Sequence, residues 1–242
     1  MRLDKLLAHT GFGTRKEVKK IIKDGYIEVN GEIQKNVGLK VDPEIDDIRV
    51  GGERIYYEEF VYFMLNKPAG VISATEDYMH ETVIDLLEPA DSVQDPHPVG
   101  RLDMDTEGLL ILTNDGQLTH QLTSPKKQVD KEYYALIEGI VTEEDIKTFN
   151  EGIVLIEEDE EYTTMPATLE IVSVDEDANE SEINVTIQEG KFHQVKRMFH
   201  AVGKEVLYLK RVRMNELKLD ESLPLGEYRR LTEEELELLQ PY

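Results

Sequence analysis

Cysteine is absent from the 242 residues of this chain, which excludes disulfide bonds and thiolate metal sites. The six histidines show no metal-ligand spacing such as His-x-x-x-His, so no metal is expected either. No apolar run approaches the roughly 20 residues of a membrane span. The N-terminus lacks the apolar stretch and the small-residue cleavage site of a signal peptide. Together these absences predict a cytoplasmic protein without a membrane partner.

Positive charge is scarce as well: the chain has 27 Lys and Arg against 51 Asp and Glu, a formal net charge of −24. Taken alone, this balance argues against a nucleic-acid partner. The distribution is uneven, however. Residues 1–40 hold nine basic and five acidic residues, residues 190–213 hold seven and one, and residues 141–182 hold one and fifteen. Because charges are screened over roughly 8 Å at physiological salt, each basic segment can act locally.

The first 58 residues have the pattern of a small domain of their own. A short amphipathic helix is expected first, and Thr14, with Glu17 three residues later, predicts the capped start of a second helix. The buried side of this second helix is expected to be Val18, Ile21 and Ile22, and its basic side Arg15, Lys16, Lys19, Lys20 and Lys23. Asn30-Gly31 is a strong hairpin signal, and Gly51-Gly52 marks a further strand pair or loop.

Residues 59–242 predict mainly strands joined by turns. Helices are expected over 81–90, 191–203 and 232–242, and the acidic cluster 157–161 is expected to be a solvated loop. Asn215 is expected in a strand turn, since Asn tolerates a positive φ. Strands that outnumber helices and follow one another through turns indicate an α+β fold with a mixed, mostly antiparallel sheet.

Residues 99–116, VGRLDMDTEGLLILTNDG, contain an apolar run between turn residues, with Arg101, Asp103 and Asp105 just before it. The plainest interpretation is structural: the aspartates cap a turn and Arg101 pairs with one of them. A glycosidase would use the two aspartates as its carboxylate pair, but two positions so close at one turn are an unpromising arrangement.

The basic helix and the Asn-Gly hairpin offer a surface for RNA phosphates, although charge alone leaves open an ordinary solvated helix. The string RLDKLLAHTGFGTRKEVKKIIKDGYIEVNGE resembles the small RNA-binding domain first described in ribosomal small-subunit protein four. This resemblance covers about the first fifty residues. It implies that the five cations of the second helix contact RNA.

The string GRLDMDTEGLLILTNDG resembles the signature of the pseudouridine synthases, in the branch shared by the RsuA and RluA groups. Three other segments resemble further motifs of the family: NKPAG (66–70), KEY (131–133) and EGKFHQVKRMFHAVG (189–203). The domain order and the ending PLGEYRRLTEEE look most like the RsuA group, which modifies small-subunit rRNA. The likeness extends over nearly the whole chain. It implies a small N-terminal helical and hairpin RNA-binding domain, followed by a catalytic domain of the pseudouridine synthase type.

The resemblance also implies a role for each matching residue. Asp103 would be the catalytic aspartate, and Tyr133 would pack against the target base. A basic residue beside Asp103, either Lys191 or Lys196, would keep its carboxylate ionised. Asp105 lies in a variable part of the motif and is expected to be structural.

Other residues near these motifs are expected to face RNA. A uridine in folded RNA must leave its stack to be reached, and Arg101 would enter the vacated space or hold the backbone. Arg197 is expected to contact RNA. His193 and Gln194 are expected to be structural or RNA-facing rather than catalytic.

The implied reaction detaches uracil from its sugar, turns it and rejoins it through carbon, with Asp103 as nucleophile or base. It needs neither metal nor organic cofactor, because nothing is oxidised, reduced or hydrolysed. We therefore predict site-specific isomerisation of uridine to pseudouridine by a monomer, acting on 16S small-subunit rRNA or an assembly intermediate. The alternatives are the same reaction on 23S large-subunit rRNA, and an rRNA-binding assembly factor without catalysis.

Overall fold

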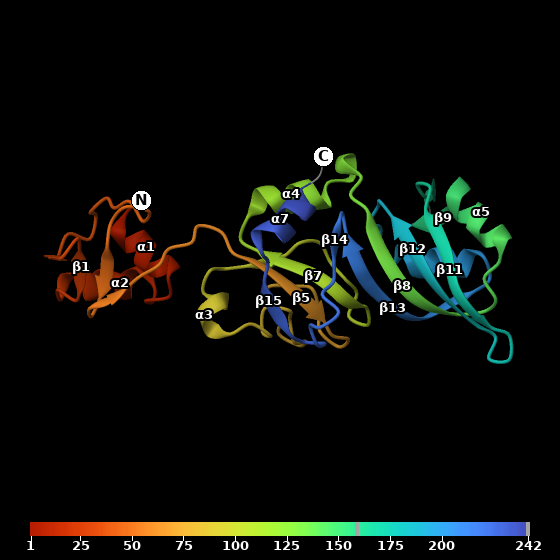
Figure 1. Ribbon diagram of the computed structural model, residues 1–242, viewed down its shortest axis with the longest axis horizontal. Coiled ribbons are helices and arrows are strands. Elements are labelled where there is room, and N and C mark those ends of the chain that lie inside the picture. Colours follow the sequence, from red (N-terminus) through yellow and green to blue (C-terminus); the bar gives the residue numbers. More distant parts are fainter. Residues whose placement is uncertain (158–159, 241–242) are drawn as a thin grey trace. The chain divides into compact units, whose positions relative to one another are not determined.

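Packing divides the computed structural model of the chain into two units, which are described separately (Figure 1). The structure describes residues 1–157 and 160–240. The first unit comprises residues 1–61 and 87–96, and the second comprises residues 62–86 and 97–242. The division expected between residues 58 and 59 lies close to the observed one, but the segment 87–96 groups with the first unit.

Two helices and an antiparallel sheet of order β2-β1-β3-β4 make up most of the first unit. Its elements are α1 (Leu3–His9), α2 (Arg15–Lys23), β1 (Ile27–Val29), β2 (Glu32–Gln34), β3 (Ile48–Val50), β4 (Glu53–Arg54) and, from the separate segment, α3 (Pro89–Ser92). Leucines of α1 pack with Val18 and Ile22 of α2 against the buried face of the sheet. Ile21, expected to be buried, is half-buried at the edge of this core.

Local sequence signals explain the turns of this unit. Thr14 and Glu17 form the predicted capping box, in which each side chain accepts a hydrogen bond from the other residue's backbone N–H. Asn30 and Gly31 have φ values of 53° and 83°, the left-handed conformation that a tight hairpin turn requires. The predicted Gly51-Gly52 turn joins β3 to β4.

The second unit is built on a nine-stranded sheet. Its strands are β5 (Tyr62–Lys67), β6 (His97–Pro98), β7 (Glu107–Thr113), β8 (Lys131–Glu138), β11 (Thr168–Asp175), β12 (Glu180–Ile187), β13 (Glu205–Met214), β14 (Leu217–Lys218) and β15 (Tyr228–Arg230). A separate hairpin is formed by β9 (Val154–Glu157) and β10 (Glu160–Thr163). The helices are α4 (Gly116–Thr123), the short 3₁₀ helix η1 (Pro125–Lys127), α5 (Glu143–Glu151), α6 (Gln194–Ala201) and α7 (Glu233–Leu239).

The sheet has the order β11-β12-β8-β13-β7-β5-β15, and its pairings are antiparallel except for β13 with β7. The α+β fold with a mixed, mostly antiparallel sheet is therefore confirmed. β7 lies inside the sheet, and its residues from Gly108 to Thr113 are buried, as its apolar run predicts. Leu109 and Ile111 of β7 pack with residues of α4 and α7, which lie together in Figure 1.

Two expectations about local structure are wrong. Residues 81–90 do not form the expected helix: Thr82 pairs with Ile72 in a β-bridge, and residues 83–86 form a turn. The helix in this segment, α3, begins only at Pro89. The acidic cluster is not simply a loop, since it supplies the end of β9 and the start of β10. Its residues 158–159, and residues 241–242 at the end of the expected C-terminal helix, lie outside the described residues.

Candidate active site

The loop that carries Asp103 into β7 is fixed by a buried lysine. Lys67 ends β5 and has no exposed surface. Its ammonium group donates hydrogen bonds to the carbonyl oxygens of Asp103, Met104 and Thr106 at 2.9–3.3 Å, and to that of Pro68 at 3.0 Å. Three of these four carbonyls belong to the loop, so Lys67 holds the backbone at Asp103 in place.

Burial lowers the pKa of Lys67 to about 8, against the opposing charges of nearby acidic side chains. Lys67 belongs to the NKPAG segment, but no role was predicted for it from the sequence. Its position was the available signal, because a lysine so close after the apolar residues FML needs acceptors once the strand is buried.

Asp103 is bound by Lys196, which lies in the first turn of α6. The Nζ atom of Lys196 donates to Oδ2 of Asp103 at 3.1 Å and to Oδ1 of Asp105 at 2.7 Å. The side chain of Asp103 is 31% exposed and that of Asp105 is 73% exposed, so the first contact is the more sheltered. The structure thus brings Lys196 to Asp103, although 93 positions separate them in the sequence.

Hydrogen bonding within this contact shifts the pKa of two of the three groups, Lys196 and Asp105. Partial burial acts to lower the pKa of Lys196, but its hydrogen bonds with Asp105 and Asp103 outweigh this effect and the pKa is raised. The hydrogen bond from Lys196 is also the main cause of a lowered pKa at Asp105. A glycosidase needs one carboxyl group held protonated as an acid, and a lysine shared between the two aspartates opposes that state.

His193 faces the other oxygen of Asp103. Its Nε2 atom is 3.5 Å from Oδ1 of Asp103. His193 precedes α6 with a φ of 48°, a left-handed conformation that few non-glycine residues adopt. Its ring stacks on that of Phe192, with ring centroids 3.7 Å apart. The sequence analysis expected a structural or RNA-facing histidine, and the structure adds this contact with Asp103.

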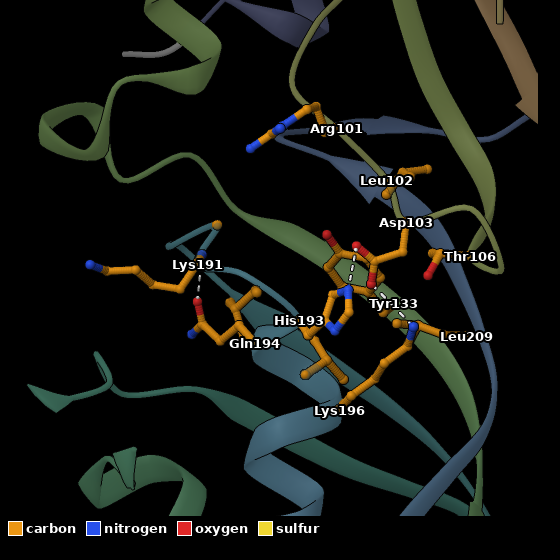
Figure 2. Close-up of a pocket in the computed structure, with 13 residues that line it drawn as sticks. Arg101, Leu102, Asp103, Thr106, Tyr133, Lys191, His193, Gln194, Lys196 and Leu209 are labelled. Carbon is orange, nitrogen blue, oxygen red and sulfur yellow. Dashed lines mark hydrogen bonds and ion pairs between the residues drawn. The ribbon is translucent and has the colours of Figure 1, made fainter. Parts of the chain in front are cut away.

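Tyr133 and Arg101 line the same pocket as Asp103. Tyr133, on β8, is only 8% exposed and lies beside Asp103 (Figure 2). Arg101 is exposed, and its guanidinium points away from Asp103 in Figure 2. Within the described part of the chain it forms no ion pair, so the structural interpretation of Arg101 as a partner of the aspartates is not supported.

Lys191 lies at the rim of the pocket and does not bind Asp103. Its side chain extends away from the aspartate in Figure 2, and its Nζ is 5.0 Å from the centre of the Tyr162 ring. Gln194 has a structural contact, since its Oε1 accepts a hydrogen bond from the backbone N–H of Lys191 at 3.1 Å. Arg197 donates to the Phe192 carbonyl at 3.1 Å, to the Tyr162 hydroxyl and to the Ile156 carbonyl. Its guanidinium therefore contacts the protein itself, and its contact with RNA stays a prediction.

The basic side of α2 is exposed along its whole length. Within residues 1–157 and 160–240, its five cations form no hydrogen bond or ion pair through their side chains. The positions are Arg15, Lys16, Lys19, Lys20 and Lys23. In a chain with 51 acidic residues, such a surface is available for phosphate groups.

The described residues contain neither a cluster of metal ligands nor a helix that could span a membrane. Nowhere in the described part of the chain do three or more His, Cys, Asp or Glu side chains gather as metal ligands would. No described helix is long and apolar enough to cross a membrane.

A carboxylate pocket on a mixed sheet, in a chain that also has an exposed basic helix, suits an enzyme that acts on RNA. Comparison with known families specifies which one. Residues 61–201 match the model of the RNA pseudouridylate synthase family, and residues 1–45 match that of the S4 domain. The chain belongs to the RNA pseudouridylate synthase family, and it is an isomerase that converts uridine to pseudouridine.

Relatives with assigned names cover the chain almost completely. It is 51% identical over 239 residues to an uncharacterised RNA pseudouridine synthase of Bacillus subtilis, covering 99% of this chain and 98% of the relative. It is 42% identical to ribosomal small subunit pseudouridine synthase A of Vibrio cholerae, with 98% of each chain covered. It is 41% identical to ribosomal large subunit pseudouridine synthase B of Bacillus subtilis, covering 98% and 95%.

A solved structure agrees with these relatives. The crystal structure of a pseudouridylate synthase matches with a TM-score of 0.68 and 40% identity, and the match covers 99% of each chain.

Proposed function

We propose that this protein isomerises a specific uridine of 16S small-subunit rRNA, with the carboxylate of Asp103 acting on the extruded nucleotide. The observation that carries the proposal is the contact of Asp103 with Lys196 at 3.1 Å, in a pocket that Tyr133 also lines. A cation at this distance favours the ionised carboxylate. An ionised carboxylate serves either as nucleophile or as base.

In the reaction, the bond from the sugar C1′ atom to N1 of uracil breaks, and a bond from C1′ to C5 forms. The proton on C5 leaves and N1 gains one, so the product is an isomer of the substrate. Three routes are open to the Asp103 carboxylate: attack on C1′, attack on C6 of the base, or removal of a sugar proton. Tyr133 supports the detached base by stacking, which contributes roughly 1–3 kcal/mol per base.

We propose that Arg101 replaces the extruded uridine or holds the RNA backbone, because its guanidinium is exposed at the pocket and free of protein partners among the described residues. The exposed cations of α2 supply further phosphate contacts. Action by a monomer is likewise part of the proposal. A cytoplasmic location stays a prediction.

The small-subunit target rests on the likeness to the RsuA group. The relatives named for the small and the large subunit are almost equally identical to this chain, at 42% and 41%. The test is to map pseudouridine in the rRNA of cells with and without this gene, using a base-specific chemical probe. Loss of one small-subunit site supports the proposal, and loss of a large-subunit site moves the target.

The same mapping tests the role of Asp103 when the gene is replaced by its Asp103→Asn variant. We expect no pseudouridine at the affected site, with RNA binding by the purified variant largely retained. Modification by Asp103→Asn at the wild-type level would remove Asp103 from its proposed role. No lost site in cells without the gene would favour the assembly-factor alternative.

A further inference from the structure

A second cavity adjoins the catalytic pocket and is lined by an excess of basic side chains. Both cavities share Arg101, Tyr133 and Lys191. The second one is also lined by Lys131 and Arg211, and by one acidic residue, Glu189. We call it the basic cavity. Four cations and one anion around one hollow are unusual in a chain of net charge −24.

None of these four cations forms an ion pair with a carboxylate in the described part of the chain. Glu189 forms no ion pair with them among the described residues, and its Oε2 atom accepts a hydrogen bond from Gln194 at 2.7 Å. Arg213, two positions after Arg211, is by contrast paired with Glu132 at 2.6 Å. The basic cavity therefore carries an excess of positive charge, which Asp130 offsets only in part at Lys131.

Lys131 and Arg211 are the most sheltered of the four. Arg211 is 2% exposed; its Nε donates to the carbonyl of Leu109 at 2.8 Å, and its Nη2 is buried without a partner. Lys131 is half-buried, and its Nζ donates to the carbonyl of Val129 at 3.1 Å. Burial, and then the nearby charge of Arg211, lower the pKa of Lys131 to about 8. Two sheltered cations that repel each other are costly unless an anion joins them.

We propose that the basic cavity binds a phosphodiester group of the substrate RNA, next to the uridine that enters the catalytic pocket. This inference rests on the proposed function. A phosphodiester carries one negative charge and two free oxygens, which suit the N–H donors of lysine and arginine. Because the two cavities share Tyr133 and Arg101, a nucleotide strand that places its uridine at Asp103 brings a neighbouring phosphate to Lys131.

The test uses the RNA fragment that contains the mapped uridine, with one phosphate at a time replaced by a neutral methylphosphonate. Affinity and single-turnover rate are measured for the full-length wild type, for Lys131→Gln and for Lys147→Gln. The last variant is a matched control, because Lys147 lies on the exposed side of α5 and does not line either cavity. Lys131→Arg tests whether the charge alone suffices. Thermal unfolding verifies that each variant is folded.

We expect one phosphate position near the uridine to weaken wild-type binding about tenfold when it is neutralised, a loss of about 1.4 kcal/mol. Lys131→Gln should bind unmodified RNA about tenfold more weakly and be insensitive to that one position. Its salt dependence, the slope of log K against log salt, should fall by about 0.7. Lys147→Gln and Lys131→Arg should retain the sensitivity of the wild type.

Equal sensitivity of Lys131→Gln and the wild type at every position would overturn the proposal. A second result would also overturn it: the wild type binds inorganic phosphate tightly, but no methylphosphonate position in the RNA weakens RNA binding. The cavity would then bind a free anion and not a phosphate of the RNA. Failure of the proposed function gives a different result, namely no pseudouridine from the wild type on unmodified RNA. In that case the affinity measurements still decide whether a phosphate binds at Lys131.

Discussion

Replacing Lys196 by methionine is the substitution that tests the electrostatics of the pocket most directly. Methionine keeps the length of the side chain and removes its charge. Asp103 and Asp105, both bound to Lys196 in the wild type, then lose their shared cation. The Asp103 carboxylate then has no lysine beside it to stabilise its negative charge. A smaller share of the enzyme then carries the active carboxylate at acidic pH.

The magnitude follows from the exposure of each contact. A hydrogen bond to a charged group contributes about 1.5–3 kcal/mol when it is sheltered. Since Asp103 is 31% exposed, we expect the lower part of this range, about 1.5–2 kcal/mol. Asp105 is 73% exposed, so its contact with Lys196 adds only about 0–1 kcal/mol. On the acidic limb of the pH profile the rate should therefore fall roughly 10- to 100-fold, since about 1.4 kcal/mol corresponds to a factor of ten.

The assay is the single-turnover rate of pseudouridine formation as a function of pH, with saturating enzyme. The acidic limb of the profile should move to higher pH in Lys196→Met and remain in place in Lys196→Arg. The double variant Lys196→Met with His193→Gln should show a larger shift, because His193 faces the other oxygen of Asp103 at 3.5 Å. An unchanged rate and acidic limb in Lys196→Met would refute the role given to this contact.

Three further predictions concern the loop, the sheet and the basic helix. Burial lowers the pKa of Lys67 to about 8, so raising the pH through about 8 should weaken its hydrogen bonds to the carbonyl groups of the Asp103 loop. The rate of pseudouridine formation should then fall in a single-proton step, and this step should be absent in Lys67→Met. This folded-state pKa lies below the unfolded value of about 10.5. Between pH values of about 8 and about 10.5, the unfolded chain therefore binds more protons than the folded chain does. The contribution of Lys67 to the free energy of unfolding should rise with pH over this range. Gly108→Ala should lower the free energy of unfolding, measured by urea titration, by about 3 kcal/mol or more. The new Cβ would lie 2.2 Å from the Arg211 carbonyl oxygen, at a residue with a φ of 103°. Gly116→Ala is the control and should be nearly neutral, because no atom lies within 4 Å of its Cβ position. Glutamine at the five basic positions of α2 should weaken RNA binding and lower the salt dependence of the affinity. The rate at saturating RNA should change little. Unchanged affinity would show that α2 is an ordinary solvated helix.

Much of the fold was predictable because its signals are local. The capping box of α2, the Asn30-Gly31 turn and the positive φ of Asn215 depend on a few adjacent residues. The helix expected over 81–90 failed for the opposite reason. Its apolar spacing suits a helix, but Thr82 forms a bridge with Ile72 from an earlier segment, and residues 83–86 form only a turn. Spacing alone does not reveal such competing contacts.

In the active site, too, some features follow from local sequence and others from contacts between distant segments. The order of apolar, turn and charged residues encodes the buried strand β7, the turn that carries Asp103 and the basic side of α2. The folded structure settled the choice between Lys191 and Lys196, since that choice depends on how α6 meets a loop 93 positions earlier. It likewise decided that Lys67 is buried beneath the loop and that Lys131 and Arg211 share a cavity. Contacts between distant segments set distances and burial, and these quantities fix the charge and position of each group.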